Sequence, residues 1–211
     1  IHTPNHRWVI SAALAQINHL YPNKKYSNRI NDWLGEGVFI DADGHYPERS
    51  GIYSGVENAA FITIARLANK PALYAPVRKN LTMYQYYIEP NGDLVRNDSR
   101  RQDQYEAAAK PSTLLYLQYR YMAVHEKNKL FAAICKQIET TKDFEKDILT
   151  SSLFYFLEDE TLQEQLPTAE GLPELYEKLF STSHLLRIKE KNTTLTLFGG
   201  TDQPLLIASG R

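Results

Sequence analysis

The stretch HLLRIKEKN, from His184 to Asn192, marks the point at which the chain changes from a helical to an extended pattern. Alternating or β-branched residues continue in the runs TTLTLFGG and PLLIAS, after short polar links. Such patterns are typical of strands that bury one face. We therefore predict antiparallel strands over residues 183–211. Three strands alone would leave an apolar face and two edges without partners, so we expect them to begin a β-sandwich domain.

Residues 1–182 instead predict a mainly helical domain. In TPNHRWVISAALAQINHLYPN, Thr3 can cap the first helix and Pro4 suits its first position. A second helix is predicted in YSNRINDWLGEG, with Ser27 as its N-cap. The spacing of apolar residues in the first helix predicts four that face the core: Val9, Ala13, Ile17 and Leu20.

Five further segments have helical periodicity. GVENAAFITIARLAN and ALYAPVRKNLTMYQYYIEPNG form one predicted pair, and others cover roughly residues 112–125, 128–140 and 143–158. The links between them are short and polar. Helices joined in this way pack as antiparallel hairpins, so we predict a domain built of helical hairpins.

The overall composition limits the classes of partner. Lys and Arg number 24 against 25 Asp and Glu, so no strong net charge favours nucleic acid or a membrane surface. No apolar run is long enough to cross a bilayer, and no signal peptide is visible. The single Cys135 has the spacing of a core thiol. Fourteen tyrosines exceed the needs of a helical core, and tyrosine is enriched on surfaces that contact sugars.

Two polar residues follow the predicted start of the first helix. Asn5 and His6 would lie in its first turn, where free N–H groups and the positive end of the helix dipole favour an anion. An amide and an imidazole at this place are suited to bind a carboxylate. The alternative is that Asn5 helps to cap the helix and His6 is a surface residue.

The connection DADGHYPERSGIY, residues 41–53, concentrates polar groups before the next helix. Its opening Asp and Gly residues predict an Asp–Gly turn rather than a calcium loop, and we predict no metal site. Tyr53 ends the segment. Its phenol would need a cation such as Arg49, Arg100 or Arg101 to lower its pKa from about 10 before it could act as a base near neutral pH. The alternative is a tyrosine that packs, with its hydroxyl hydrogen-bonded.

A second polar segment, NDSRRQDQY, covers residues 97–105. Its paired arginines, Arg100 and Arg101, stand beside Gln102 and Asp103, and such a group could bind a sugar acid through paired hydrogen bonds. The alternative is a solvated helix start with internal ion pairs.

These segments resemble a known family. DADGHYPERSGIY and PNHRW resemble two motifs of the heparinase II/III-like polysaccharide lyases, in the same order. LPELYEKLFSTSHLLRIKEKNTTLTLFGG resembles the junction at which those proteins pass from a helical (α/α) toroid to an antiparallel β-sandwich. Family members usually carry small residues where this chain has Arg7 and Trp8, so we expect a narrower or specialised cleft here.

The resemblance implies that residues 1–182 form part of an (α/α) toroid and that the chain cleaves a uronic-acid polysaccharide by β-elimination. It implies that Asn5, with His6 beside it, neutralises the substrate carboxylate and that Tyr53 is the base, the acid or both. No cofactor is expected, and a polymer substrate suggests a periplasmic or secreted protein. Residues expected to contact the substrate are His45, Glu48, Arg49, Arg100, Arg101, Gln102 and Asp103.

Two other interpretations of the sequence remain open. A glycoside hydrolase on the same scaffold would use two carboxylates such as Glu48 and Asp103 as acid and base. A non-catalytic protein would bind glycan through a tyrosine-rich surface and convert nothing.

Overall fold

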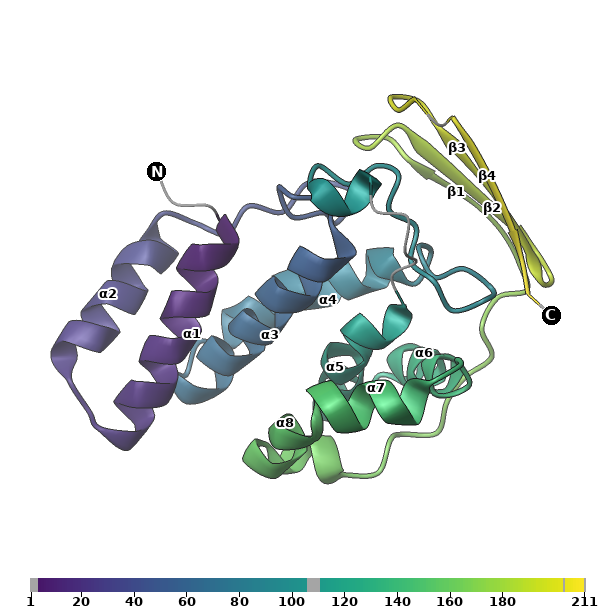
Figure 1. The fold of residues 1–211 in the computed structure, drawn as a ribbon. Helices are drawn as coiled ribbons and strands as arrows, with labels where there is room; N and C mark the ends of the chain where they lie inside the picture. The colour runs from purple at the N-terminus through teal and green to yellow at the C-terminus, as the bar shows by residue number, and fades with distance from the viewer. Residues whose placement is uncertain (1–3, 106–110, 203, 211) are drawn as a thin grey trace.

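The computed structural model describes residues 4–105, 111–202 and 204–210 and shows helices in one part and a single sheet in the other (Figure 1). The helices are α1 Pro4–Leu20, α2 Lys24–Gly35, α3 Gly51–Leu67, α4 Tyr74–Tyr84, α5 Tyr116–Glu126, α6 Lys129–Glu139, α7 Phe144–Ser151 and α8 Leu153–Glu158. Short 3-10 helices are η1 Pro71–Leu73, η2 Gln102–Tyr105, η3 Ser112–Leu115 and η4 Glu160–Gln163. The strands are β1 Leu175–Phe180, β2 Leu185–Glu190, β3 Thr193–Phe198 and β4 Leu205–Ser209.

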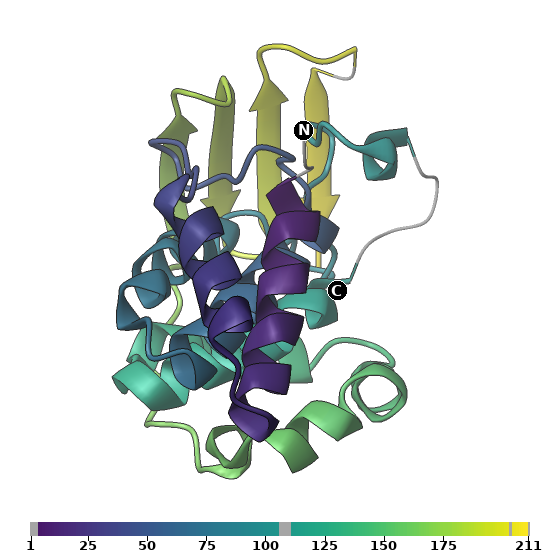
Figure 2. The same cartoon turned by 90° about the vertical axis from the view of Figure 1, so that its left-hand side faces the viewer.

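The predicted helical hairpins are present. Helices α1 and α2, α3 and α4, and α5 and α6 each pack against each other after a turn of the chain (Figure 1). The first helix of one hairpin also packs on the next, because α1 lies along α3. Helices α1 and α3 both begin at the end of the helical part that is nearest the sheet (Figures 1 and 2).

The face that α1 turns to the core differs from the predicted one. Trp8 is buried with its ring centroid 5.0 Å from that of Phe61 on α3, and Ala15 is buried two turns later. Apolar residues occur on several sides of this helix, so the largest aromatic side chain decides which side is buried. The four residues predicted to face the core are exposed: Val9, Ala13, Ile17 and Leu20.

The start of α2 also differs from the prediction. The side chain of Asn23 accepts a hydrogen bond from the backbone N–H of Lys25 and is the N-cap. Because Asn23 caps the helix four residues before Ser27, the helix already includes Ser27, and the predicted cap is wrong. The helix ends at Gly35. Thr3, the predicted cap of α1, lies outside the described residues.

The four strands form an antiparallel meander in the order β1-β2-β3-β4. Strand structure begins at Leu175, eight residues before the predicted change at Ser183. Strand β1 was missed because Glu177 and Lys178 interrupt its apolar pattern, and most of its side chains are exposed.

The two faces of the sheet differ in burial. The inner face packs on the helical part through residues such as Phe180, Leu185 and Phe198, which are buried and paired across three strands. The outer face carries two apolar rows across the strands, and four of the residues in these rows are exposed by more than two fifths. One row is Leu179, Leu186, Leu197 and Leu205, and the other includes Ile188, Leu195 and Ile207.

A buried ion pair attaches the sheet to the helices. Arg187 on β2 is fully buried and donates from Nη1 and Nη2 to the two carboxylate oxygens of Glu89, at 2.8 and 3.1 Å. Its Nε donates to the backbone oxygen of Tyr86 at 2.7 Å. Thr194 and Thr196 on β3 complete the hydrogen bonds of the pair. Glu89 and Tyr86 follow α4, so this pair fixes the position of the sheet.

Other sequence predictions have mixed outcomes. Cys135 is a buried core thiol, as predicted. No helix among the described residues is long and apolar enough to cross a membrane. The core contains seven of the fourteen tyrosines: Tyr46, Tyr74, Tyr84, Tyr87, Tyr116, Tyr119 and Tyr121.

We predict that Arg187→Ala destabilises the fold by about 3–5 kcal/mol, because it leaves the Glu89 carboxylate buried without its partner. Urea unfolding followed by circular dichroism measures this change. The double variant Arg187→Leu with Glu89→Leu should recover part of the loss, since neither charge then remains in the interior. Glu177→Ala, on the exposed part of β1, is the control and should change stability by less than about 0.5 kcal/mol. A loss below about 1 kcal/mol for Arg187→Ala would contradict the anchoring role.

Candidate functional site

Tyr53 lies in the first turn of α3, three residues after the N-cap Ser50. Its phenol oxygen accepts hydrogen bonds from Gln102 Nε2 at 3.2 Å and from Arg101 Nη2 at 3.0 Å. The guanidinium of Arg101 also lies 4.4 Å from the centre of the Tyr53 ring. The hydrogen bonds from Gln102 and Arg101 lower the pKa of Tyr53, because both stabilise its charged form. The ring is partly exposed, so this phenol is accessible from solvent.

Asp103 holds the two donors in place. Its carboxylate is buried and accepts hydrogen bonds from the hydroxyls of Ser50 at 2.7 Å and Ser99 at 2.5 Å. The backbone N–H of Arg100 also donates to the backbone oxygen of Glu48 at 2.9 Å. These bonds tie the segment before η2 to the start of α3. Asp103 therefore has a positioning role in place of the expected substrate contact.

His45 belongs to the interior as well. It is fully buried, and its Nε2 lies 2.9 Å from the hydroxyl of Tyr87. That hydroxyl donates to Asp98 at 3.0 Å, so His45 donates its own proton from Nε2. Burial lowers the pKa of His45 to about 4, which keeps the ring neutral near pH 7. His45 is thus an interior residue that holds the loop in place, in contrast to the substrate contact expected from the sequence.

The loop of residues 41–50 begins with the predicted Asp–Gly turn. Asp41 Oδ1 accepts hydrogen bonds from the backbone N–H groups of Gly44 and His45, both at 2.9 Å. Gly44 has φ +109°, a conformation that side-chain-bearing residues rarely adopt. The residues that resembled the opening of a calcium loop therefore make a turn.

The same loop is attached to the β1–β2 turn. Asp43 Oδ2 accepts from the backbone N–H groups of Thr182 and Ser183 at 2.8 and 2.9 Å, and from the Ser183 hydroxyl at 3.0 Å. Arg49 donates from Nη2 to the backbone oxygen of Thr182 at 2.9 Å and lies 3.7 Å from Asp41. The candidate site therefore lies where the helices meet the sheet, and Arg49 helps to hold that junction together.

Asn5 and His6 are in the first turn of α1, as predicted. Asn5 is buried and its Oδ1 accepts from the backbone N–H of His6 at 2.7 Å, whereas the His6 side chain is exposed. No hydrogen bond among the described residues joins either residue to Tyr53. The bulky pair after them makes contacts within the protein: Trp8 packs in the core, and Arg7 pairs with Glu36 at the end of α2.

Two buried carboxylates near Tyr53 lack partners. Glu48 precedes α3, and Glu57 lies one helical turn after Tyr53 on the same helix. Both are at least nine-tenths buried, and none of their four carboxylate oxygens has a hydrogen-bond partner among the described residues. Burial and then the charge of Glu48 raise the pKa of Glu57 to about 9, while Arg7 opposes them. Glu48 is thus an interior group and does not present a free carboxylate to a substrate.

Sequence reasoning missed Glu57. The only signal was a single acid in the apolar run GVENAAFITIA, four residues after Tyr53. An acid in a helix is usually solvated, whereas this one is fully buried on α3, the helix against which α1 packs.

We predict that Glu57→Gln makes the protein more stable at pH 8, by about 2 kcal/mol or more. Because its pKa is raised, Glu57 keeps its proton in the folded state at pH values at which the unfolded chain has released it, that is, above the ordinary carboxyl pKa of 4.5. The stability of the wild type should therefore fall as pH rises from about 4.5 to about 9, whereas glutamine removes this dependence. Urea unfolding at several pH values measures it, with Glu177→Gln as the exposed control. Parallel pH profiles for wild type and Glu57→Gln would contradict a buried, protonated Glu57.

Comparisons of the chain with protein-family models, with curated proteins and with solved structures find no match. Function is therefore inferred from the geometry of the residues around Tyr53.

Proposed function

We propose that the protein is a polysaccharide lyase that cleaves a uronic-acid glycan by β-elimination. The observation that carries the proposal is the partly exposed phenol of Tyr53, held by Arg101 and Gln102 with a lowered pKa. Removing the proton at C5 of a uronate needs a base that is available near neutral pH. A tyrosine beside a guanidinium meets this need, whereas a tyrosine that only packs in a core does not.

The proposed reaction uses Tyr53 twice. Its phenolate takes the proton from C5, the electron pair of that C–H bond forms the C4–C5 double bond, and the bond from C4 to the glycosidic oxygen breaks. Tyr53 then returns the proton to the leaving oxygen. Negative charge develops on the substrate carboxylate during this step. His6, which is exposed at the positive end of α1, is the group proposed to stabilise it, whereas the buried Asn5 would act by holding the first turn of that helix through its bond to the His6 backbone N–H.

Cationic and amide side chains around Tyr53 suit an acidic substrate. Arg100 and Gln102 are exposed and Arg101 is partly exposed, so all three can reach a carboxylate on a neighbouring sugar. The two acids of the hydrolase interpretation do not have this access, because Glu48 and Asp103 are both buried. No observation favours that second reaction.

We propose that the helical hairpins are part of an (α/α) toroid and that the sheet is one layer of a β-sandwich. The two apolar rows on the outer face of the sheet support this, since a second sheet packed on them would remove them from water. An acidic polymer as substrate supports a periplasmic or secreted protein.

We predict that the protein acting on alginate, heparan or chondroitin gives ultraviolet absorbance from an unsaturated product with at least one of them. Tyr53→Phe keeps the ring but removes the transferable proton, so kcat should fall about a hundredfold or more with little change in thermal stability. Tyr105→Phe is the matched control, because Tyr105 is a highly exposed tyrosine near the same segment. The Tyr105→Phe variant should keep the activity of the wild type.

Two results would contradict the proposal. New reducing ends without ultraviolet absorbance would indicate hydrolysis. Binding of oligosaccharide without any product would indicate the non-catalytic interpretation.

A second prediction concerns pH. Arg101→Met removes a hydrogen bond and a positive charge that lower the pKa of Tyr53, so the acidic limb of the kcat/KM profile should move to higher pH. Arg101→Lys keeps the charge and should move the limb less. Profiles that coincide for all three proteins would show that Arg101 does not tune the base.

A further inference from the structure

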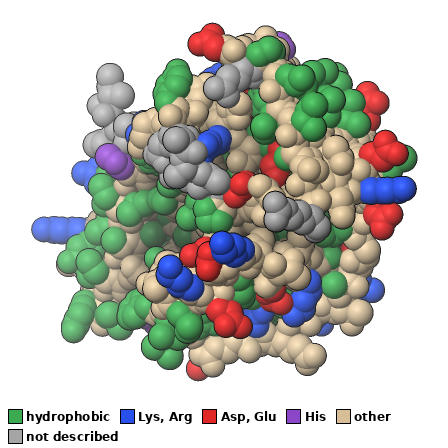
Figure 3. Space-filling view, turned by 45° about the vertical axis from the view of Figure 1, so that its right-hand side comes forward, with side chains coloured by type: hydrophobic (Ala, Val, Ile, Leu, Met, Phe, Trp, Pro, Cys, Tyr) green, Lys and Arg blue, Asp and Glu red, His purple; other side chains and the backbone are tan. Residues whose placement is uncertain are grey.

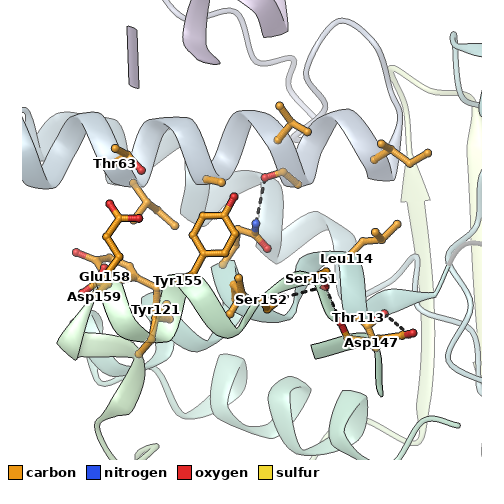
Figure 4. Close-up of a pocket in the computed structure, with 18 of the residues that line it drawn as sticks. Thr63, Thr113, Leu114, Tyr121, Asp147, Ser151, Ser152, Tyr155, Glu158 and Asp159 are labelled. Atoms are coloured by element: carbon orange, nitrogen blue, oxygen red, sulfur yellow. Dashed lines mark hydrogen bonds between the residues drawn. The ribbon is translucent and has the colours of Figure 1, made fainter. Parts of the chain in front are cut away.

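A cavity of about 470 Å³ lies between α3 on one side and α5, α7 and α8 on the other (Figure 4). Its volume is in the range of small-molecule sites. The α3 residues that line it include Ile52, Val56, Ala59 and Thr63, which recur at helical spacing and form one stripe. None of the residues predicted from the sequence as site residues lines this cavity, so it is separate from the site around Tyr53.

Much of the wall is apolar. Val56 and Ala59 from α3 line it together with Leu114 from η3, Leu117 from α5 and Leu162 from η4. Hydrophobic side chains also gather around a hollow in the surface in the view of Figure 3. Such a wall is suited to the hydrocarbon part of a ligand.

The charged groups in the cavity are mostly acidic. Asp147, Glu158 and Asp159 line it, and Arg66 is the one cation among the lining residues that the structure describes. Arg66 is already engaged, because it lies 3.4 Å from both Glu158 and Asp159. Asp147 lies at the opposite end of the cavity and accepts one hydrogen bond, from the Thr113 hydroxyl at 3.1 Å (Figure 4). The carboxylates therefore outnumber the cations, and Asp147 has no cationic partner among the described residues.

The uncharged polar groups add further electron-rich atoms. Gln118 is buried and donates from Nε2 to the backbone oxygen of Gly55, which leaves its Oε1 without a partner among the described residues. The rings of Tyr121 and Tyr155 also line the cavity, and aromatic faces attract cations. Carboxylates, an amide oxygen and aromatic faces each attract cations, so the lining as a whole suits a cation rather than an anion.

We propose that this cavity binds an organic amine, with its hydrocarbon part against the apolar wall and its ammonium group at Asp147. A uronate would be repelled by the acidic groups, so the ligand differs in chemical class from the proposed substrate. The inference does not depend on the lyase proposal.

Three probes of equal chain length test it: octylamine, octanoate and octan-1-ol, measured by calorimetric titration of the protein. An alkylamine is protonated at neutral pH, as a lysine side chain is. Octylamine should bind at least about tenfold more tightly than octanoate, and Asp147→Asn should weaken octylamine binding about fivefold or more. Glu177→Gln removes one negative charge on the distant sheet and should leave binding unchanged.

Ala59→Phe tests the location, because a phenyl ring placed there would occupy part of the cavity and should reduce octylamine binding. Circular dichroism melts check that each variant folds. If Ala59→Phe does not fold, the effect of Asp147→Asn on octylamine binding tests the proposal. Three results would overturn the proposal: no saturable binding of octylamine, equal binding of the three probes, or octylamine binding that Asp147→Asn leaves unchanged.

Discussion

The carboxylate of Asp103 is the constraint on which the candidate site depends. It accepts hydrogen bonds from Ser50, the N-cap of α3, and from Ser99, so it fastens two segments that are about fifty residues apart in the chain. This connection, together with the backbone bond from Arg100 to Glu48, brings Arg101 and Gln102 to the phenol of Tyr53. A buried carboxylate is costly unless it is hydrogen-bonded, and here those bonds also place the site.

The junction of helices and sheet gives the site its rigid surroundings. Asp43, in the loop before α3, accepts hydrogen bonds from the β1–β2 turn, and Arg187 on β2 donates to Glu89 in the segment after α4. The loop is thus held between the sheet and the helix that carries Tyr53. Side chains held in this way keep their geometry when a ligand binds, which electrostatic stabilisation of a developing charge requires.

The sequence predicted features set by local periodicity and missed those set by packing. The helical hairpins were predictable from apolar spacing, but the buried face of α1 was not, because Trp8 decides it through contact with α3. The need of Tyr53 for a nearby cation was predictable from its chemistry, and Arg101 meets it. Whether His45 and Asp103 face a substrate or the interior was not predictable, since the same polar residues serve both purposes and only the tertiary fold buries them.

Arg101 and Gln102 make the phenol of Tyr53 easier to ionise than that of an ordinary tyrosine. Carbon-13 NMR of ring-labelled tyrosines measures this directly, and the resonance missing from Tyr53→Phe identifies the residue. We predict that this resonance titrates with a midpoint below the usual value of about 10 and moves to higher pH in Arg101→Met, while buried tyrosines such as Tyr84 stay protonated. A midpoint at or above the usual value, or one that Arg101→Met leaves unchanged, would contradict the account.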